Sequence, residues 1–175
     1  LLSVERDTLS SEQRIEYSSS ITLNAEKLIT LVNNVLDLSR LESGMMRFDV
    51  QSYDVVQLCR DAIYMAGMQE GNLATVTFEH DVESLMLRID SSRFHKLMTS
   101  MFTAKDAVSI HCKLIVAGGE QEIKLVVTGS PLSASSPDRL RQIQHDINRL
   151  FIEIFHGSYT IESEKACITV CFPLA

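Results

Sequence analysis

The chain has 175 residues and a formal net charge of −7, with 45% hydrophobic and 22% charged residues. This balance is typical of a globular protein, with room for one domain and an appendage or for two small units. The negative charge argues against nucleic acid or an anionic membrane as a partner. No apolar run approaches the ~20 residues of a membrane span and no signal peptide is expected, so we predict a cytoplasmic chain without membrane contact, alone or within a larger membrane sensor.

The cysteines and histidines form no recognisable metal-binding or redox motif. Cys59, Cys112, Cys167 and Cys171 include no C-x-x-C pair, and the histidines have no metal-ligand companions at a useful spacing. We therefore expect buried, reduced thiols and no metal site.

A long amphipathic helix is predicted from Ser10 to Gly44. Ser10 and Gln13 have the spacing of a capping box, and Gly44 is a typical helix stop. Apolar residues alternate at spacings of four and three, as in a helix packed on partner helices: Ile21, Ala25, Leu28, Val32 and Val35. Ile29, Leu36 and Leu41 widen this seam. Because such a helix is ~50 Å long, the chain is too short to cover it, and we expect a homodimer through the seam.

The polar side of the same helix is a candidate docking surface. Its predicted partner-binding residues are Arg14, Tyr17 and Lys27, and Ser18, Asn24 and Asn34 are further candidates. These positions follow from helix geometry alone.

The end of the helix carries a resemblance to a known family. The run from Leu36 to Gly44, with the sequence LDLSRLESG, resembles the end of the second dimerisation-hairpin helix in bacterial two-component sensor histidine kinases. In that family the first hairpin helix carries the phosphorylated histidine in an H-[ED]-x-x-x-P setting, and no histidine precedes Ser10 here. The resemblance implies a partial hairpin in residues 1–44, lacking the histidine, and an ATPase domain in residues 45–175.

The remaining elements alternate between helices and strands. Asp54 caps a helix that Gly71-Asn72 closes, and strands are predicted over Thr75–Glu79 and Leu85–Ile89. Asp90 opens a second helix with a methionine-rich apolar face, which we interpret as core. Strands Val108–Ala117 and Glu122–Thr128 follow, joined by Gly118 to Gln121. A loop from Gly129 to Pro137 leads into a helix that starts at Ser136 or Asp138 and has Ile143, Ile147, Leu150, Phe151 and Ile154 facing inward. A strand pair, Ser158–Glu162 and Cys167–Phe172, ends the chain.

This order predicts an α+β fold with a layer of helices on one mixed sheet. It resembles the Bergerat-type ATP-binding sandwich shared by histidine kinases, gyrase and Hsp90, preceded by the long hairpin helix.

The resemblance implies three motifs that hold Mg·ATP, and the sequence departs from each. At the two asparagines of N-x-x-x-N stand Ser100 and Ala104, or Thr99 and Thr103 in a register shifted by one. Thr128 stands where the family has the aspartate of D-x-G-x-G. Gln142 and Gln144 stand at the glycines of G-x-G-L. We therefore expect no cofactor and no catalytic residues.

Two functions are consistent with this sequence. The first is a pseudokinase of the histidine kinase family that binds no ATP, dimerises and binds a partner kinase or the receiver domain of a response regulator. The alternative is a fragment of a sensor histidine kinase or histidine phosphotransferase whose phosphoacceptor histidine lies upstream of Leu1. The sequence that precedes Leu1 would distinguish them.

Overall fold

The computed structural model describes residues 10–104, 107–117, 122–130, 132 and 139–174. The helices are α1 (Ser11–Glu42), α2 (Val55–Gly67), α3 (Ser91–Phe102) and α4 (Arg139–Ile154). The strands are β1 (Val50–Asp54), β2 (Thr75–His80), β3 (Met86–Asp90), β4 (Ser109–Ala117), β5 (Glu122–Thr128), β6 (Ser158–Glu162) and β7 (Cys167–Pro173), with a 3-10 turn η2 (Ser163–Lys165) before β7. The predicted connection from Gly118 to Gln121, most of the predicted loop from Gly129 to Pro137 and the predicted helix start at Ser136 or Asp138 lie outside the described residues.

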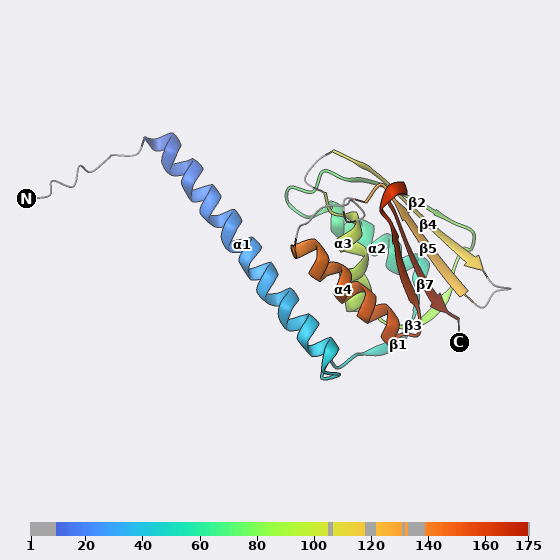
Figure 1. The fold of residues 1–175 in the computed structure, drawn as a ribbon. Coiled ribbons are helices and arrows are strands. Elements are labelled where there is room, and N and C mark those ends of the chain that lie inside the picture. The colour runs from blue at the N-terminus through green and yellow to red at the C-terminus, as the bar shows by residue number, and fades with distance from the viewer. Residues whose placement is uncertain (1–9, 105–106, 118–121, 131, 133–138, 175) are drawn as a thin grey trace, which may run out of the picture.

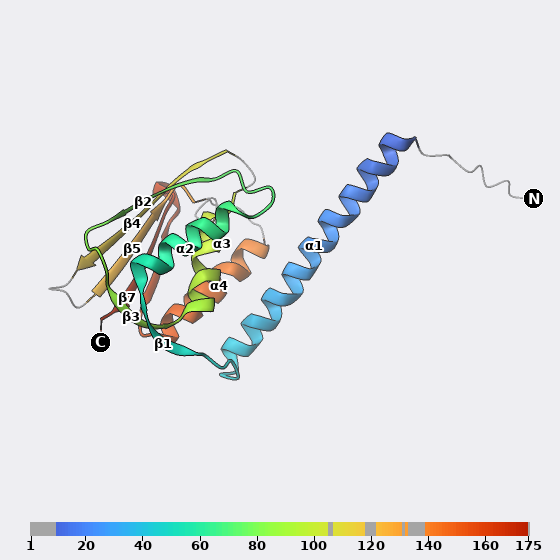
Figure 2. The ribbon, with the colours of Figure 1, turned by 180° about the vertical axis from the view of Figure 1, so that it is seen from behind.

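One mixed sheet of five strands forms one layer of the domain. Its strand order is β2-β4-β5-β7-β6. The β2–β4 pair is parallel and the other pairs are antiparallel. A separate antiparallel pair joins β1 to β3. Helices α2, α3 and α4 lie together on one face of the large sheet, and α1 runs beside them and extends beyond them (Figures 1 and 2). The predicted α+β fold with a helix layer on a mixed sheet is confirmed.

The core lies between the sheet and this helix layer, and α3 supplies its centre. Phe94, Met98, Met101 and Phe102 are fully buried. They belong to one cluster with inward-facing strand residues, among them Ile110, Leu114, Ile123, Leu125, Val127, Ile168, Val170 and Phe172. The interpretation of the methionine stripe as core is confirmed, because unbranched methionines fill the space between helix and sheet.

The three predicted helix starts that fall on described residues are confirmed. Ser10 and Gln13 make a reciprocal capping box, with the Gln13 backbone N–H donating to Ser10 Oγ and the Ser10 N–H to Gln13 Oε1. Asp54 accepts from the Val56 N–H at the start of α2. Asp90 accepts from the Arg93 N–H at the start of α3. Each cap satisfies donors that a helix leaves unpaired at its first turn.

The prediction that Gly71-Asn72 closes the helix capped by Asp54 is wrong by one turn, since this helix, α2, ends at Gly67. Asn72 has a different role. Its amide donates to the carbonyl oxygens of Ala66 and Phe102, and its Oδ1 accepts from the N–H groups of Ala74 and Ala104. One side chain thereby joins the carboxyl ends of α2 and α3.

The predicted inner face of the last helix is also partly wrong. Ile154 is 42% exposed, whereas Ile152 is fully buried and Asn148 is 2% exposed. Phe151 is buried as predicted, and Ile143, Ile147 and Leu150 are half-buried. The inner face is rotated because α4 packs against α1 as well as against the sheet, and that packing could not be inferred from the helix alone.

The predicted seam of α1 faces away from the rest of the chain. Ile21 is 68% exposed, Leu28 60%, Val32 49% and Val35 47%. At 3.6 residues per turn these residues lie on the side opposite Asn34 and Leu41. Leu41, assigned to the seam from the sequence, is instead buried at 7% exposure, since the end of α1 turns this face toward α4.

Candidate functional site

The positions of the family's first ATP motif lie at the end of α3. Ser100 Oγ donates to the carbonyl oxygen of Leu97 at 2.6 Å and accepts from Asn148 Nδ2 at 3.1 Å. Ala104 is buried, and its N–H donates to Asn72. In the shifted register, Thr103 Oγ1 bonds to Gln69 and to the Thr99 carbonyl. Neither register supplies the pair of amide side chains that the family uses.

The second motif position lies at the end of β5. Thr128 pairs with His111 of β4 and Cys167 of β7. Gly129 follows with φ +77°, where a Cβ would collide with the carbonyl oxygen of Ser109. Next, the buried Ser130 donates through Oγ to the Met101 carbonyl at 2.7 Å and accepts from the Leu132 N–H. The chain after β5 is therefore bonded to α3.

The third motif position lies inside α4, which runs without interruption from Arg139 to Ile154. Gln142 is exposed and reaches Asp146 at 3.4 Å. Gln144 Nε2 donates to Asn148 Oδ1 at 2.9 Å, and its Oε1 accepts from Asn34 Nδ2 of α1 at 3.4 Å. No glycine-rich turn exposes backbone N–H groups at this place, because both positions lie within the helix.

These side chains form one hydrogen-bonded relay across three helices. It runs from Asn34 on α1 through Gln144 and Asn148 on α4 to Ser100 on α3. Among the described residues, no buried side-chain nitrogen or oxygen atom lacks a partner. Two predicted ATP-motif positions, Ser100 and Gln144, are thus brought together, and Gln142, Thr128 and Ala104 lie outside the relay.

Asn148, at the centre of the relay, was missed by the sequence reasoning. It lies four residues before Ile152 and seven before Phe155, in step with the apolar face of α4. A polar residue on an otherwise apolar helix face was the signal in the sequence that could have indicated a buried hydrogen-bonding role. It also hydrogen-bonds Tyr159, whose pKa burial raises to about 12. Tyr159 OH lies 2.8 Å from His145 Nδ1, and burial lowers the pKa of His145.

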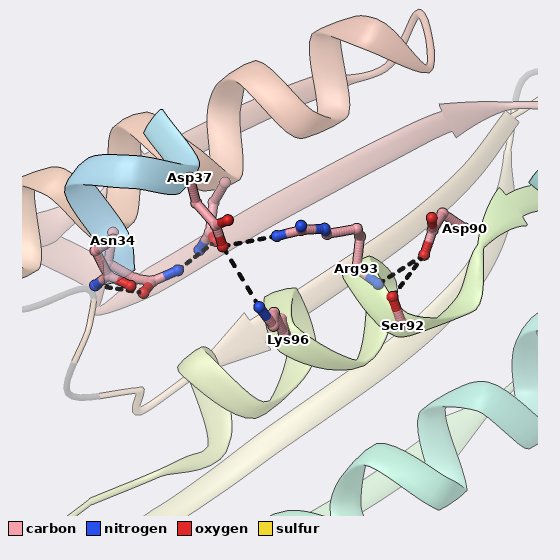
Figure 3. Close-up of polar contacts among 8 residues, drawn as sticks. Asn34, Asp37, Asp90, Ser92, Arg93 and Lys96 are labelled. Atoms are coloured by element: carbon pink, nitrogen blue, oxygen red, sulfur yellow. Dashed lines mark hydrogen bonds and ion pairs between the residues drawn. The ribbon is translucent and has the colours of Figure 1, made fainter. Parts of the chain in front are cut away.

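An ion pair joins α1 to α3 beside the relay. Asp37 Oδ2 lies 2.7 Å from Arg93 Nη1 and 3.4 Å from Lys96 Nζ (Figure 3). Burial alone would raise the pKa of Asp37, but the hydrogen bond and charge of Arg93 and the charge of Lys96 outweigh it, and the pKa is lowered. Asp37 is therefore held as a carboxylate.

A cavity of about 950 Å³ lies beside these contacts, between α1 and the helix layer. Its walls include Asn33 and Asp37 from α1, Tyr64 and Met65 from α2, and Lys96 from α3. No group of three or more His, Cys, Asp or Glu side chains in the described ranges is arranged to hold a metal ion. None of the helices described between residues 10 and 174 has the length and apolar character needed to cross a bilayer.

The predicted partner-binding residues lie far from this site, on the first half of α1. Arg14, Tyr17 and Lys27 are all exposed. They do not share one face, because Arg14 and Lys27 are about 140° apart on a helix of 3.6 residues per turn. Arg14 lies seven residues before Ile21 and therefore on the same helix face as the seam, beyond its N-terminal end. Asn34, a further candidate, is half-buried and bonded to Gln144 of α4.

No protein-family model matches this chain. Similar curated proteins are the hybrid signal transduction histidine kinase L of Dictyostelium discoideum, 27% identical over 130 residues, and the autoinducer 2 sensor kinase/phosphatase LuxQ of Vibrio cholerae, 27% identical over 120 residues. The matches cover 69% and 64% of this chain but only 8% and 14% of those proteins. The chain therefore spans a small part of the relatives that it matches.

Solved structures share the fold. Full-length ShkA in complex with AMPPNP superposes with a TM-score of 0.68 at 16% identity, over 95% of this chain and 40% of that one. The histidine kinase ThkA, solved in complex with the response regulator TrrA, gives a TM-score of 0.65 at 17% identity, over 97% of this chain and 54% of that one. The sequence matches to hybrid and sensor histidine kinases support a two-component histidine kinase family for this chain, and the solved structures show that it has a GHKL-like fold.

Proposed function

We propose that this chain is a pseudokinase module of the histidine kinase family, which does not bind ATP and acts by binding other proteins. In this proposal residues 1–44 form part of a dimerisation hairpin and residues 45–175 form a degenerate ATPase domain. The module pairs with a second copy through α1 and binds a partner kinase or the receiver domain of a response regulator. The complex of ThkA with TrrA supports a regulator as a partner class.

The relay through Asn148 is the observation that carries this proposal. Mg²⁺ prefers oxygen ligands in a near-octahedral arrangement, and phosphoryl transfer depends on positioning and charge around the triphosphate. Ala104 has no ligand atom, and Ser100 is already bonded to Asn148 and Leu97. Gln142 and Gln144 fill helix positions where the family exposes backbone amides. These residues do not fit Mg·ATP.

Titration calorimetry with Mg·ATP tests the proposal. We expect no binding heat up to millimolar nucleotide, beyond that of a titration with Mg²⁺ alone. A micromolar Kd would contradict the pseudokinase assignment, and so would an increase of several degrees in Tm at millimolar Mg·ATP, because a ligand of the folded state stabilises it by mass action.

The alternative is a piece of a sensor kinase or phosphotransferase whose phosphoacceptor histidine lies upstream of Leu1. The exposed seam of α1 supports it, because a preceding hairpin helix could pack there. The test is transfer of labelled phosphate between a phosphorylated receiver domain and a chain extended upstream. Labelling of an upstream histidine would favour phosphotransfer over a purely scaffolding role.

A further inference from the structure

The lower half of α1 is attached to the ATPase-like domain through one face. Asp37 contacts Arg93 and Lys96 of α3. Asn34, three residues earlier on the same face, donates to Gln144 of α4, and Leu41, four residues later, is buried. Residues at spacings of three and four share a helix face. One face of α1 therefore contacts both α3 and α4, and the seam on the opposite face is left open.

The attachment does not extend along the whole of α1. From Arg14 to Glu26, α1 borders a second open cavity of about 910 Å³, whose other wall is formed by Gln69 and Glu70. At the other end, the chain from Ser43 to Asp49 contains no helix or strand. Phe48 at the end of this connection packs on Phe151 and Phe155. Before Phe48 no regular structure fixes the angle between α1 and the domain, so the contacts near Asp37 contribute to the position of the domain.

The ion pair between Asp37 and Arg93 is largely shielded from solvent. The side chain of Asp37 is 17% exposed and that of Arg93 is 23% exposed, so solvent screens this pair less than a surface pair. Asp90 positions the arginine, because its carboxylate accepts from the Arg93 N–H and the Ser92 hydroxyl and holds the first turn of α3 (Figure 3). The same carboxylate accepts from the Asp49 N–H in the connection to α1.

We propose that Asp37, Arg93 and Lys96 form an electrostatic latch that holds the ATPase-like domain in one position against α1. Through this latch a displacement of α1 moves α3 directly, and through Asn34 and Gln144 it also moves α4. The domain then moves together with α1. A partner that competes with Asp37 for Arg93 and Lys96 would release the domain from α1. The latch consists of protein side chains alone, so its test does not depend on whether the chain binds ATP.

The test measures one distance across the latch by pulsed electron paramagnetic resonance. Nitroxides are attached at Glu12→Cys on α1 and Glu164→Cys in η2, both exposed sites, while the four native cysteines are buried. Labelled chains are diluted with unlabelled protein so that only distances within one chain are seen. We expect one narrow distribution for the native latch and a broad distribution for Asp37→Arg, which sets like charges against each other.

Two further variants separate the latch from a general loss of structure. The exchange of charges in Asp37→Arg with Arg93→Asp should restore a narrow distribution, and Glu26→Arg, the same charge change at an exposed position of α1, should leave it narrow. If Asp37→Arg fails to fold, Asp37→Asn removes the charge at nearly equal size and should also broaden the distribution. A broad distribution in the native protein would overturn the latch. An unchanged narrow one in a folded Asp37 variant, or no restoration by the exchange, would do the same.

Discussion

At the scale of single residues, polar side chains in this protein join segments that lie far apart in the chain. Asn72 holds the ends of α2 and α3, and Asn148 connects Gln144 to Ser100. Amides suit this role because one side chain both donates and accepts. In this chain these amides bond its own helices to one another.

Asn148→Ala should destabilise the fold. It removes the acceptor of Gln144 Nε2 and the donor to Ser100 Oγ, and losing one partner of a buried hydrogen bond costs about 1–3 kcal/mol. Urea unfolding followed by circular dichroism measures the loss. Gln142→Ala, an exposed change on the same helix, should stay within about 0.5 kcal/mol of the native protein. Equal effects of the two changes would mean that the relay does not contribute to stability.

The Asp90 cap should make stability depend on pH in acid. Burial alone would raise the pKa of Asp90, but hydrogen bonds from the Arg93 and Asp49 N–H groups and the Ser92 hydroxyl, with the charge of Arg93, lower it below its ordinary value of 3.8. A lowered pKa in the folded state adds stability above the ordinary value, and this stability is lost as pH falls through the lowered value. Asp90→Asn should therefore reduce Tm at pH 7 and flatten its decrease below about pH 4. Calorimetric scans across that range measure both effects. A decrease as steep as in the native protein would be inconsistent with this role.

At the scale of elements, α1 has two faces with different partners. The face of Asn34, Asp37 and Leu41 meets α3 and α4, and the opposite face carries the exposed apolar seam. Apolar residues repeating along one helix face, exposed in the single chain, are typical of a helix that packs against others. The homodimer follows from this division of α1 and stays a prediction.

Replacing both Leu28 and Val32 by Asp should leave monomers, because a paired seam would bury carboxylates without partners. Light scattering during gel filtration at tens of micromolar measures the mass. Lys27→Asp changes the net charge by the same amount but lies on the side of α1 that faces the domain, and it should remain dimeric. A monomeric native protein would contradict the prediction.

At the scale of the whole molecule, the latch and the relay hold the ATPase-like domain against α1, and the first half of α1 stands clear of it (Figures 1 and 2). Partners can reach this exposed half without contacting the relay between α1, α3 and α4. We therefore expect recognition to depend on α1 rather than on α4.

Charge reversal at Arg14 and Lys27 should weaken binding of a receiver domain or partner kinase without a change in Tm, since exposed substitutions cost about 0.5 kcal/mol or less. Gln142→Ala with Gln144→Ala should leave binding unchanged, although losing the Gln144 bonds lowers Tm slightly. Surface plasmon resonance with an isolated receiver domain measures both. If the glutamine pair abolishes binding and the charge pair has no effect, the ATPase-like domain is the docking surface.

The sequence by itself determined the features that depend on neighbours along the chain. The caps at Ser10, Asp54 and Asp90 and the methionine stripe of α3 could be predicted from local spacing, because a helix face and a cap involve residues within one or two turns. Only the tertiary structure decided which distant segments meet. The pairing of Asp37 with Arg93 spans 56 positions and that of Asn34 with Gln144 spans 110. The burial of Asn148 and of Leu41 likewise follows from packing among α1, α3 and α4, and no pattern within one helix contains that packing.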